Sequence, residues 1–210
     1  MITVENVSKT YGGQTALAPT TLTLALLNPL VPSATAAEPY AIEMVAEARL
    51  AQIPAGPLYW RVETFPTLAQ ATAARGPASL VAEVAGTAWL FTLGPAGGST
   101  PGARRAAEIG PVPTISAPEY LLRMNHVSGP PGAKTPVHTH PGSETFFVLS
   151  GRLGQRTPHG MVSVEAGQSM AGHAPGLPME VSSNGANDLD ALVMFVVDAS
   201  RPFSSPARLE

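Results

Sequence analysis

The sequence predicts an all-β fold, a sandwich or barrel built from many short strands. At least seven runs rich in β-branched or aromatic residues lie within about 145 residues, each bounded by Gly, Pro, Asn or Asp. No long helical pattern separates these runs, which favours a sandwich or barrel. The 20 Gly and 22 Pro suit a chain with many turns. The runs cover residues 58–64, 79–94, 119–127, 144–156, 161–167, 179–183 and 191–199.

Two short helices are expected ahead of most of these strands. Residues 41–53 carry apolar side chains at mixed three- and four-residue spacings, among them Ile42 and Leu50, which predicts an amphipathic helix. Residues 65–77 have Pro66 near the start and Gly76 near the end, a pattern typical of a second helix.

The length of 210 residues is enough for one well-buried core but hardly for two full domains. We expect residues 1–37 to be a leader outside the fold and residues 38–118 to add strands and helices around the core. Residues 119–203 are then the core barrel, and residues 204–210 a short tail.

The leader has the features of a secretory signal. An apolar stretch covers Ala16–Val31, and small residues follow it, so cleavage is expected after Ala36 or Ala37. The mature protein would then begin near Glu38 and be periplasmic or secreted; without cleavage it would be cytoplasmic. The stretch is short and broken by prolines, so no membrane span is expected.

Composition excludes several function classes. The formal charge of −3 and the absence of Lys/Arg clusters with interleaved aromatics leave no surface for nucleic acid. There is no cysteine, so disulfides, thiolate metal sites and cysteine nucleophiles are excluded. Any metal ion must be held by imidazole, by carboxylate or, weakly, by thioether.

The stretch "TPVHTHPGSETFFVLSG", residues 135–151, contains the candidate metal ligands. On an extended strand His138 and His140 point to the same face, about 7 Å apart at Cα. The following turn returns the chain, so the carboxylate of Glu144 can supply a third ligand. Two histidines and one carboxylate with open positions suit a divalent transition metal: Fe, Mn, Ni, Cu or Zn.

The spacing of Gly132, His138, His140, Glu144 and Gly151 matches the first motif of the cupin superfamily. Residues 119–203 therefore resemble a small single-domain cupin. This resemblance implies a jelly-roll β-barrel, here with one or two short N-terminal helices, whose mouth holds a metal ion in many members. It also implies a small-molecule ligand and a homodimer formed through an edge strand.

The second motif of that family departs from its usual form. In "AGQSMAGHAPGLPMEVSSNG" the glycines and the asparagine have equivalents, but Met179 stands where a fourth histidine ligand is expected. Met179 can be a soft ligand, an apolar filler beside a three-ligand site, or the mark of a site that binds no metal. His173, in the preceding turn, is a candidate substitute for the missing histidine.

Further candidates lie nearby. His126 ends a strand and can line the barrel mouth as a proton carrier, whereas His159 is expected at a hairpin tip. Either Gln155 or Arg156 can face inward and orient a substrate, and alternation alone does not select between them.

Two functions remain open at this stage. The first is a metal-dependent enzyme, dioxygenase-like or isomerase-like, in which Glu144 is either a metal ligand or a catalytic base. The second is a non-catalytic small-ligand-binding or sensory protein with a degenerate metal site, to which the replacement at Met179 is suited.

Overall fold

The computed structural model describes residues 9–11, 14–16, 40–113 and 115–209. Within the predicted leader, β1 (Lys9–Tyr11) and β2 (Gln14–Ala16) pair as a short antiparallel hairpin. The rest of the leader and the expected cleavage site lie outside the described residues, so the secretory signal stays a prediction. The helices in the described part of the chain are all too short to cross a bilayer.

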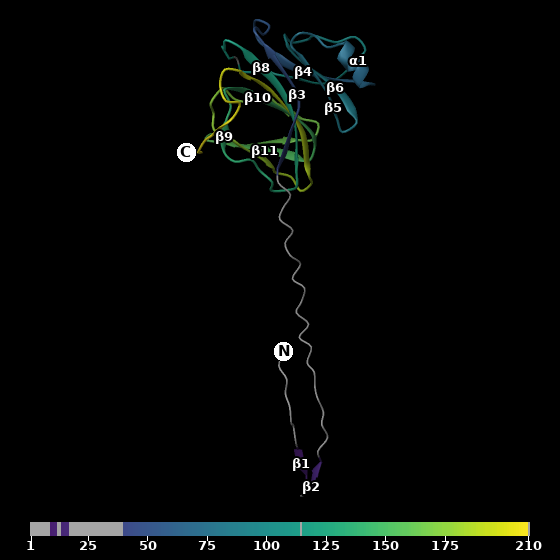
Figure 1. The fold of residues 1–210 in the computed structure, drawn as a ribbon, viewed down its shortest axis with the longest axis vertical. Coiled ribbons are helices and arrows are strands. Elements are labelled where there is room, and N and C mark those ends of the chain that lie inside the picture. The colour runs from purple at the N-terminus through teal and green to yellow at the C-terminus, as the bar shows by residue number, and fades with distance from the viewer. Residues whose placement is uncertain (1–8, 12–13, 17–39, 114, 210) are drawn as a thin grey trace. The chain divides into compact units, whose positions relative to one another are not determined.

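The described residues from 40 to 209 are built almost wholly of antiparallel strands, and the predicted all-β fold is confirmed (Figure 1). Three sheets carry most of it. A four-stranded sheet has the order β5-β6-β4-β7, a five-stranded sheet β13-β10-β15-β8-β3, and a three-stranded sheet β12-β11-β14. The first sheet consists of β4 (Tyr59–Phe65), β5 (Ser79–Val84), β6 (Thr87–Gly94) and β7 (Arg104–Ile109).

The other strands belong to the jelly-roll part of the fold. The five-stranded sheet consists of β3 (Ala41–Leu50), β8 (Tyr120–Gly129), β10 (Gly142–Ser150), β13 (Ser169–Met170) and β15 (Leu189–Asp198). The three-stranded sheet consists of β11 (Arg152–Thr157), β12 (Gly160–Glu165) and β14 (Glu180–Ser183). A separate pair joins β9 (His138–Thr139) to β16 (Ser205–Pro206).

The five-stranded sheet is the middle layer, and its central strands β10, β15 and β8 are largely buried on both faces. Alternate residues of β8 and β15 point to opposite faces. Leu122 and Met194 pack with Trp60 of the four-stranded sheet, whereas Val193 packs with Leu153 of the three-stranded sheet. Because both faces are covered, β15 is a nearly unbroken apolar run rather than an alternating one.

The expected helix over residues 41–53 is wrong, because Ala41–Leu50 form strand β3 at the edge of the middle sheet. β3 pairs with β8 and contains a bulge between Met44 and Ala46. A bulge adds one residue and reverses the alternation. Ile42 therefore lies on the face of β3 that lines the cavity, with its side chain 57% exposed, whereas Leu50 packs against the four-stranded sheet. This reversal produced the mixed spacing that imitates a helix.

The second expected helix is confirmed as α1 (Leu68–Ala73), which lies within residues 65–77. Thr67 caps its N-terminus by accepting a hydrogen bond from the backbone N–H of Gln70. Its buried residue, Ala71, belongs to a small cluster that also contains Leu90 of the four-stranded sheet.

Gly132 and Gly151 have φ of +86° and +71°, the left-handed region in which glycine avoids the strain of a side chain. Gly151 joins β10 to β11, and a Cβ there would collide with the backbone of Asp188. These glycines fix the turns at which the chain enters and leaves the strands that carry the histidine motif.

The packing between layers can be tested at Phe91, which is fully buried between the four-stranded and five-stranded sheets. Phe91→Ala is expected to lower the free energy of unfolding by about 3–5 kcal/mol, because it leaves a cavity in the shared core. Met161→Ala, at a side chain that is 52% exposed, is the control and should change it by less than about 0.5 kcal/mol. Denaturant unfolding measures both; equal effects would contradict the three-layer packing.

Candidate metal centre

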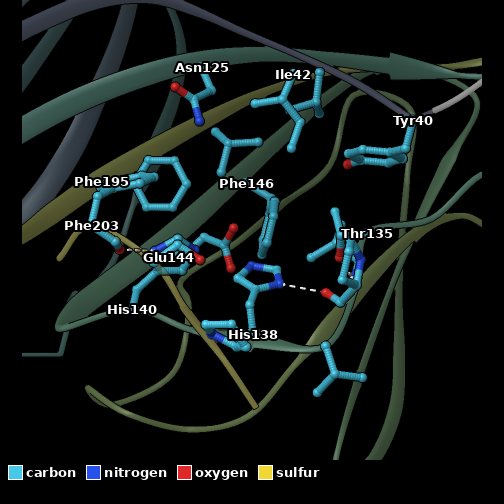
Figure 2. A pocket seen from close by; sticks show the side chains of 17 residues that line it. Tyr40, Ile42, Asn125, Thr135, His138, His140, Glu144, Phe146, Phe195 and Phe203 are labelled. Atoms are coloured by element: carbon cyan, nitrogen blue, oxygen red, sulfur yellow. Dashed lines mark hydrogen bonds between the residues drawn. The ribbon is translucent and has the colours of Figure 1, made fainter. Parts of the chain in front are cut away.

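Strand β9 and the start of β10 bring the predicted histidines and glutamate together. His138 belongs to β9, His140 lies in the turn after it, and Glu144 is the third residue of β10. One possible ligand atom from each lies within 4.8 Å of the other two. Figure 2 shows the three side chains converging at one end of a pocket.

Hydrogen bonds to backbone carbonyls set the orientation of both imidazole rings. His138 Nδ1 lies 2.8 Å from the carbonyl oxygen of Pro136, and His140 Nδ1 lies 2.6 Å from that of Phe203 (Figure 2). A carbonyl can only accept, so each Nδ1 carries the proton and donates it. The lone pair of each Nε2 is then free, as a metal-ligating histidine requires.

The protonation state of His140 also suits ligation. Burial lowers the pKa of His140 to about 4, although the hydrogen bond to the carbonyl of Phe203 acts in the opposite direction. The ring is therefore neutral near pH 7, and only neutral imidazole can donate a lone pair to a metal ion.

Glu144 is buried without a cationic partner. Its side chain makes no salt bridge within 4.0 Å among the described residues, and its contact with Gln155 Nε2 is long, at 3.4 Å. Burial raises the pKa of Glu144 to about 8, and the Gln155 contact offsets this only in part. A buried carboxylate must be protonated or be paired with positive charge. With two free imidazole nitrogens beside it, the donor set fits a divalent transition metal.

The three side chains adjoin a cavity of about 330 Å³. Its walls are mainly apolar, and neither lysine nor arginine lines it within the described part of the chain. Two walls come from segments distant in sequence: Tyr40 and Ile42 at and just before the start of β3, and Phe203, Ser204 and Pro206 near the C-terminus. The remaining apolar lining residues are Val127, Pro136, Val137, Phe146, Val181, Val193 and Phe195.

Polar groups in the cavity wall have no partner in the protein. The hydroxyl of Tyr40 and the amide oxygen of Asn125 are buried and make no hydrogen bond. Burial, with a smaller contribution from Glu144, raises the pKa of Tyr40, so its hydroxyl stays protonated and can donate. Figure 2 shows Tyr40 and Asn125 in the wall of the pocket that the histidines also line. Unpaired groups of this kind are available to orient a ligand.

Met179 lies beside the metal centre but does not line the cavity. Its side chain is buried, and its sulfur lies 3.2 Å from Nε2 of Gln155, the same amide that contacts Glu144. Its backbone exchanges two hydrogen bonds with His138, at 2.8 and 2.9 Å. This arrangement favours the interpretation of Met179 as packing beside a three-ligand site.

The other candidate histidines lie away from the three converging residues. His173 and His159 line a separate surface groove. His126 is on the opposite face of β8 from the cavity-lining Asn125, and its Nε2 lies 2.7 Å from Asp190 Oδ1. The structure therefore does not bring His126 or His173 to the metal centre.

Of the two candidates on β11, Gln155 faces inward. It is fully buried and contacts Glu144, whereas Arg156 is exposed and forms an ion pair with Glu180. Sequence reasoning did not identify Tyr40 or Phe203. Neither belongs to a periodic pattern, because Tyr40 precedes β3 and Phe203 lies in an irregular segment after β15.

Comparison with known proteins identifies the jelly-roll part. A family model described as Cupin domain matches residues 125–195. Similar solved structures include the polyketide cyclase RemF from Streptomyces resistomycificus (21% identity, 42% of this chain and 62% of that chain, TM-score 0.36). They also include a cupin-like protein from Thermotoga maritima (16%, 41% and 64%, TM-score 0.37) and the DMSP lyase DddQ from Ruegeria pomeroyi (24%, 41% and 43%, TM-score 0.36). The matches span less than two thirds of these chains, and no curated protein matches.

The pKa values of Glu144 and His140 predict how the stability of the metal-free protein changes with pH. The folded pKa of Glu144, about 8, lies above its ordinary 4.5, so stability falls as pH rises through that interval. The folded pKa of His140, about 4, lies below its ordinary 6.5, so stability rises between those values. The two effects on stability oppose each other below pH 6.5. From pH 6.5 to 8 only the effect of Glu144 remains, and it lowers the stability of the metal-free protein as pH rises.

Chelator-treated protein should therefore melt at progressively lower temperature between pH 6.5 and 8, and Glu144→Gln should flatten this decline. Glu83→Gln, at an exposed position on β5, is the control and should keep the wild-type slope. Thermal melts at half-unit pH intervals measure the change of melting temperature with pH in all three proteins. The same decline in Glu144→Gln as in the wild type would contradict a buried, unpaired carboxylate.

Proposed function

The chain is a member of the cupin superfamily through its domain at residues 125–195, and on this premise we propose that it is a metal-dependent enzyme acting on a small molecule. In this proposal His138, His140 and Glu144 hold one divalent transition metal ion. The observation that carries it is the convergence of two free imidazole nitrogens on a buried carboxylate that has no cationic partner.

The bound ion would supply Lewis acidity toward an oxygen atom of the substrate, and it would leave coordination positions open. The protein's own residues supply the remaining requirements. The apolar walls exclude water and bind the body of the substrate, and the Tyr40 hydroxyl can donate a hydrogen bond to its polar end. These features favour a substrate of mainly apolar character that reaches the metal centre through an oxygen-bearing group.

Glu144 has a second available role. Its raised pKa means that, without a neighbouring positive charge, its carboxyl carries a proton near pH 7 and can accept or release it within the cavity. Either dioxygenase-like or isomerase-like chemistry can use Glu144 as a metal ligand or as a base. We propose the ligand role, because the possible ligand atoms of all three residues lie within 4.8 Å of one another.

A non-catalytic, ligand-binding role is the second candidate. The observation that favours it is Met179, which replaces the expected fourth histidine and whose sulfur is engaged by Gln155. A site with three ligands can hold a metal ion without turning over a substrate. Homodimerisation and export are further proposals that follow from the cupin resemblance and the N-terminal sequence.

Metal titration tests the metal site itself. Chelator-treated protein should bind about one equivalent of Fe(II), Mn(II), Ni(II), Cu(II) or Zn(II), measured by calorimetry and elemental analysis. His138→Ala and His140→Ala should each weaken binding by at least about 100-fold, since each removes a ligand. His173→Ala, in the separate groove, should bind as tightly as the wild type. Equal binding by all four proteins would refute the proposed site.

Oxygen uptake separates the two functional candidates. Metal-loaded protein should consume oxygen with at least one member of a panel of catechols, flavonols and β-diketones, and Glu144→Gln should lower that rate by at least about 100-fold. A parallel assay follows isomerisation of the diketones by NMR. Tight retention of a panel compound with no turnover in either assay would favour the binding protein.

A further inference from the structure

After leaving the middle sheet, residues 199–209 pass beside His140 and pair with β9. We refer to this segment as the C-terminal strap. Strand β15 ends at Asp198, whose side chain accepts hydrogen bonds from the backbone N–H and the hydroxyl of Ser200 and so stabilises a tight turn. The chain then pairs with β9 through Ser205 and Pro206. Ala207 adds a backbone hydrogen bond to the carbonyl of Val137.

The strap contacts His140 in two ways. The carbonyl of Phe203 accepts the Nδ1 proton of His140 at 2.6 Å, and the Phe203 ring lies against the imidazole with a centroid separation of 4.8 Å (Figure 2). The ring also packs against Phe195, and the guanidinium of Arg123 lies over it at 4.0 Å. Arg123 is in turn held by Glu47 of β3.

The two histidines differ in what holds them. His138 donates to Pro136, two residues away in its own loop, so its orientation is set locally. His140 donates to a residue 63 positions further along the chain, beyond the cupin match at residues 125–195. Phe195 and His138 pack against the His140 ring, but among the described residues its one hydrogen bond comes from the strap, whereas the hydrogen bond of His138 comes from its own loop.

We propose that the C-terminal strap is a working part of the metal centre and that the Phe203 carbonyl is a positioning group. It holds His140 in the Nδ1–H tautomer and so leaves Nε2 as the nitrogen that can bind a metal ion beside His138 and Glu144. The inference rests on the proposed metal-binding function, but its structural part concerns the metal-free protein.

Truncation tests it directly. A protein ending at Pro202 lacks the Phe203 carbonyl, and a matched protein ending at Arg208 keeps the whole strap pairing. In metal-free full-length protein, long-range ¹H–¹⁵N NMR of the imidazoles should show the Nδ1–H tautomer at both His138 and His140. The Pro202 truncation should convert His140 to a mixture of tautomers while His138 keeps its own. The Arg208 truncation should match the full-length protein.

Metal affinity supplies the second readout. The Pro202 truncation should bind metal about 10–100-fold more weakly than the full-length protein, the range expected when a ligand loses its orienting hydrogen bond. Phe203→Ala removes the ring but keeps the carbonyl, because the pairing of β16 with β9 holds the backbone. It should retain both the tautomer and, within about threefold, the affinity.

The outcomes separate the inference from the proposed function. If the full-length protein binds no metal but His140 alone changes tautomer on truncation, the proposed function fails and the positioning role stands. An unchanged His140 tautomer in the folded Pro202 truncation would overturn the positioning role. The positioning role would also be overturned if both His138 and His140 became mixtures of tautomers in the truncation. The strap would then act only by holding β9 in place. If the Pro202 truncation does not fold, Phe203→Ala is the test. A mixture of His140 tautomers in Phe203→Ala would show that packing of the Phe203 ring sets the tautomer, and it would overturn the role of the carbonyl.

Discussion

The buried carboxylate of Glu144 is the constraint on which the rest of the site depends. A charged group removed from water is stable only when positive charge or several hydrogen bonds compensate it. Here the protein supplies a single long contact from Gln155 and no salt bridge from any described residue. The two imidazoles present lone pairs rather than protons to the same space. A cation held by all three residues satisfies the carboxylate and both nitrogens together.

The layered fold holds the buried Glu144 carboxylate next to the two imidazoles. Glu144 is in β10, within a sheet whose outer face is covered by the N-terminal four-stranded sheet instead of water. Close packing of these strands on both faces holds the Glu144 backbone in place, while its side chain faces the cavity. The cavity is then completed by residues outside the cupin match, Tyr40 and Ile42 on one side and Phe203 on another. The parts of this chain that are not shared with the family model thus shape the space that a ligand would occupy.

Much of the fold and the chemical centre could be predicted from the sequence, because they depend on local spacing. His138, His140 and Glu144 are separated by a strand and a tight turn, so their convergence follows from strand geometry. Residues 41–50 could not be assigned correctly, because a bulge reverses the face of β3 and depends on pairing with a strand about 80 residues away. Phe203 could not be identified either, since its contact with His140 joins residues 63 positions apart and leaves no pattern in the sequence. Inward-facing Gln155 was one of two alternatives that only the register of β11 could separate.

X-ray absorption spectroscopy of the metal-loaded protein reports the atoms bound to the ion and so tests whether His138, His140 and Glu144 are the ligands. We expect scattering from two imidazole rings together with oxygen ligands at about 2.0–2.2 Å, and no sulfur ligand. Replacing Glu144 with Gln should alter the oxygen shell and leave the imidazole scattering in place. A spectrum without imidazole scattering, or one with a sulfur neighbour at about 2.3 Å that would implicate Met179, would contradict the three-ligand site.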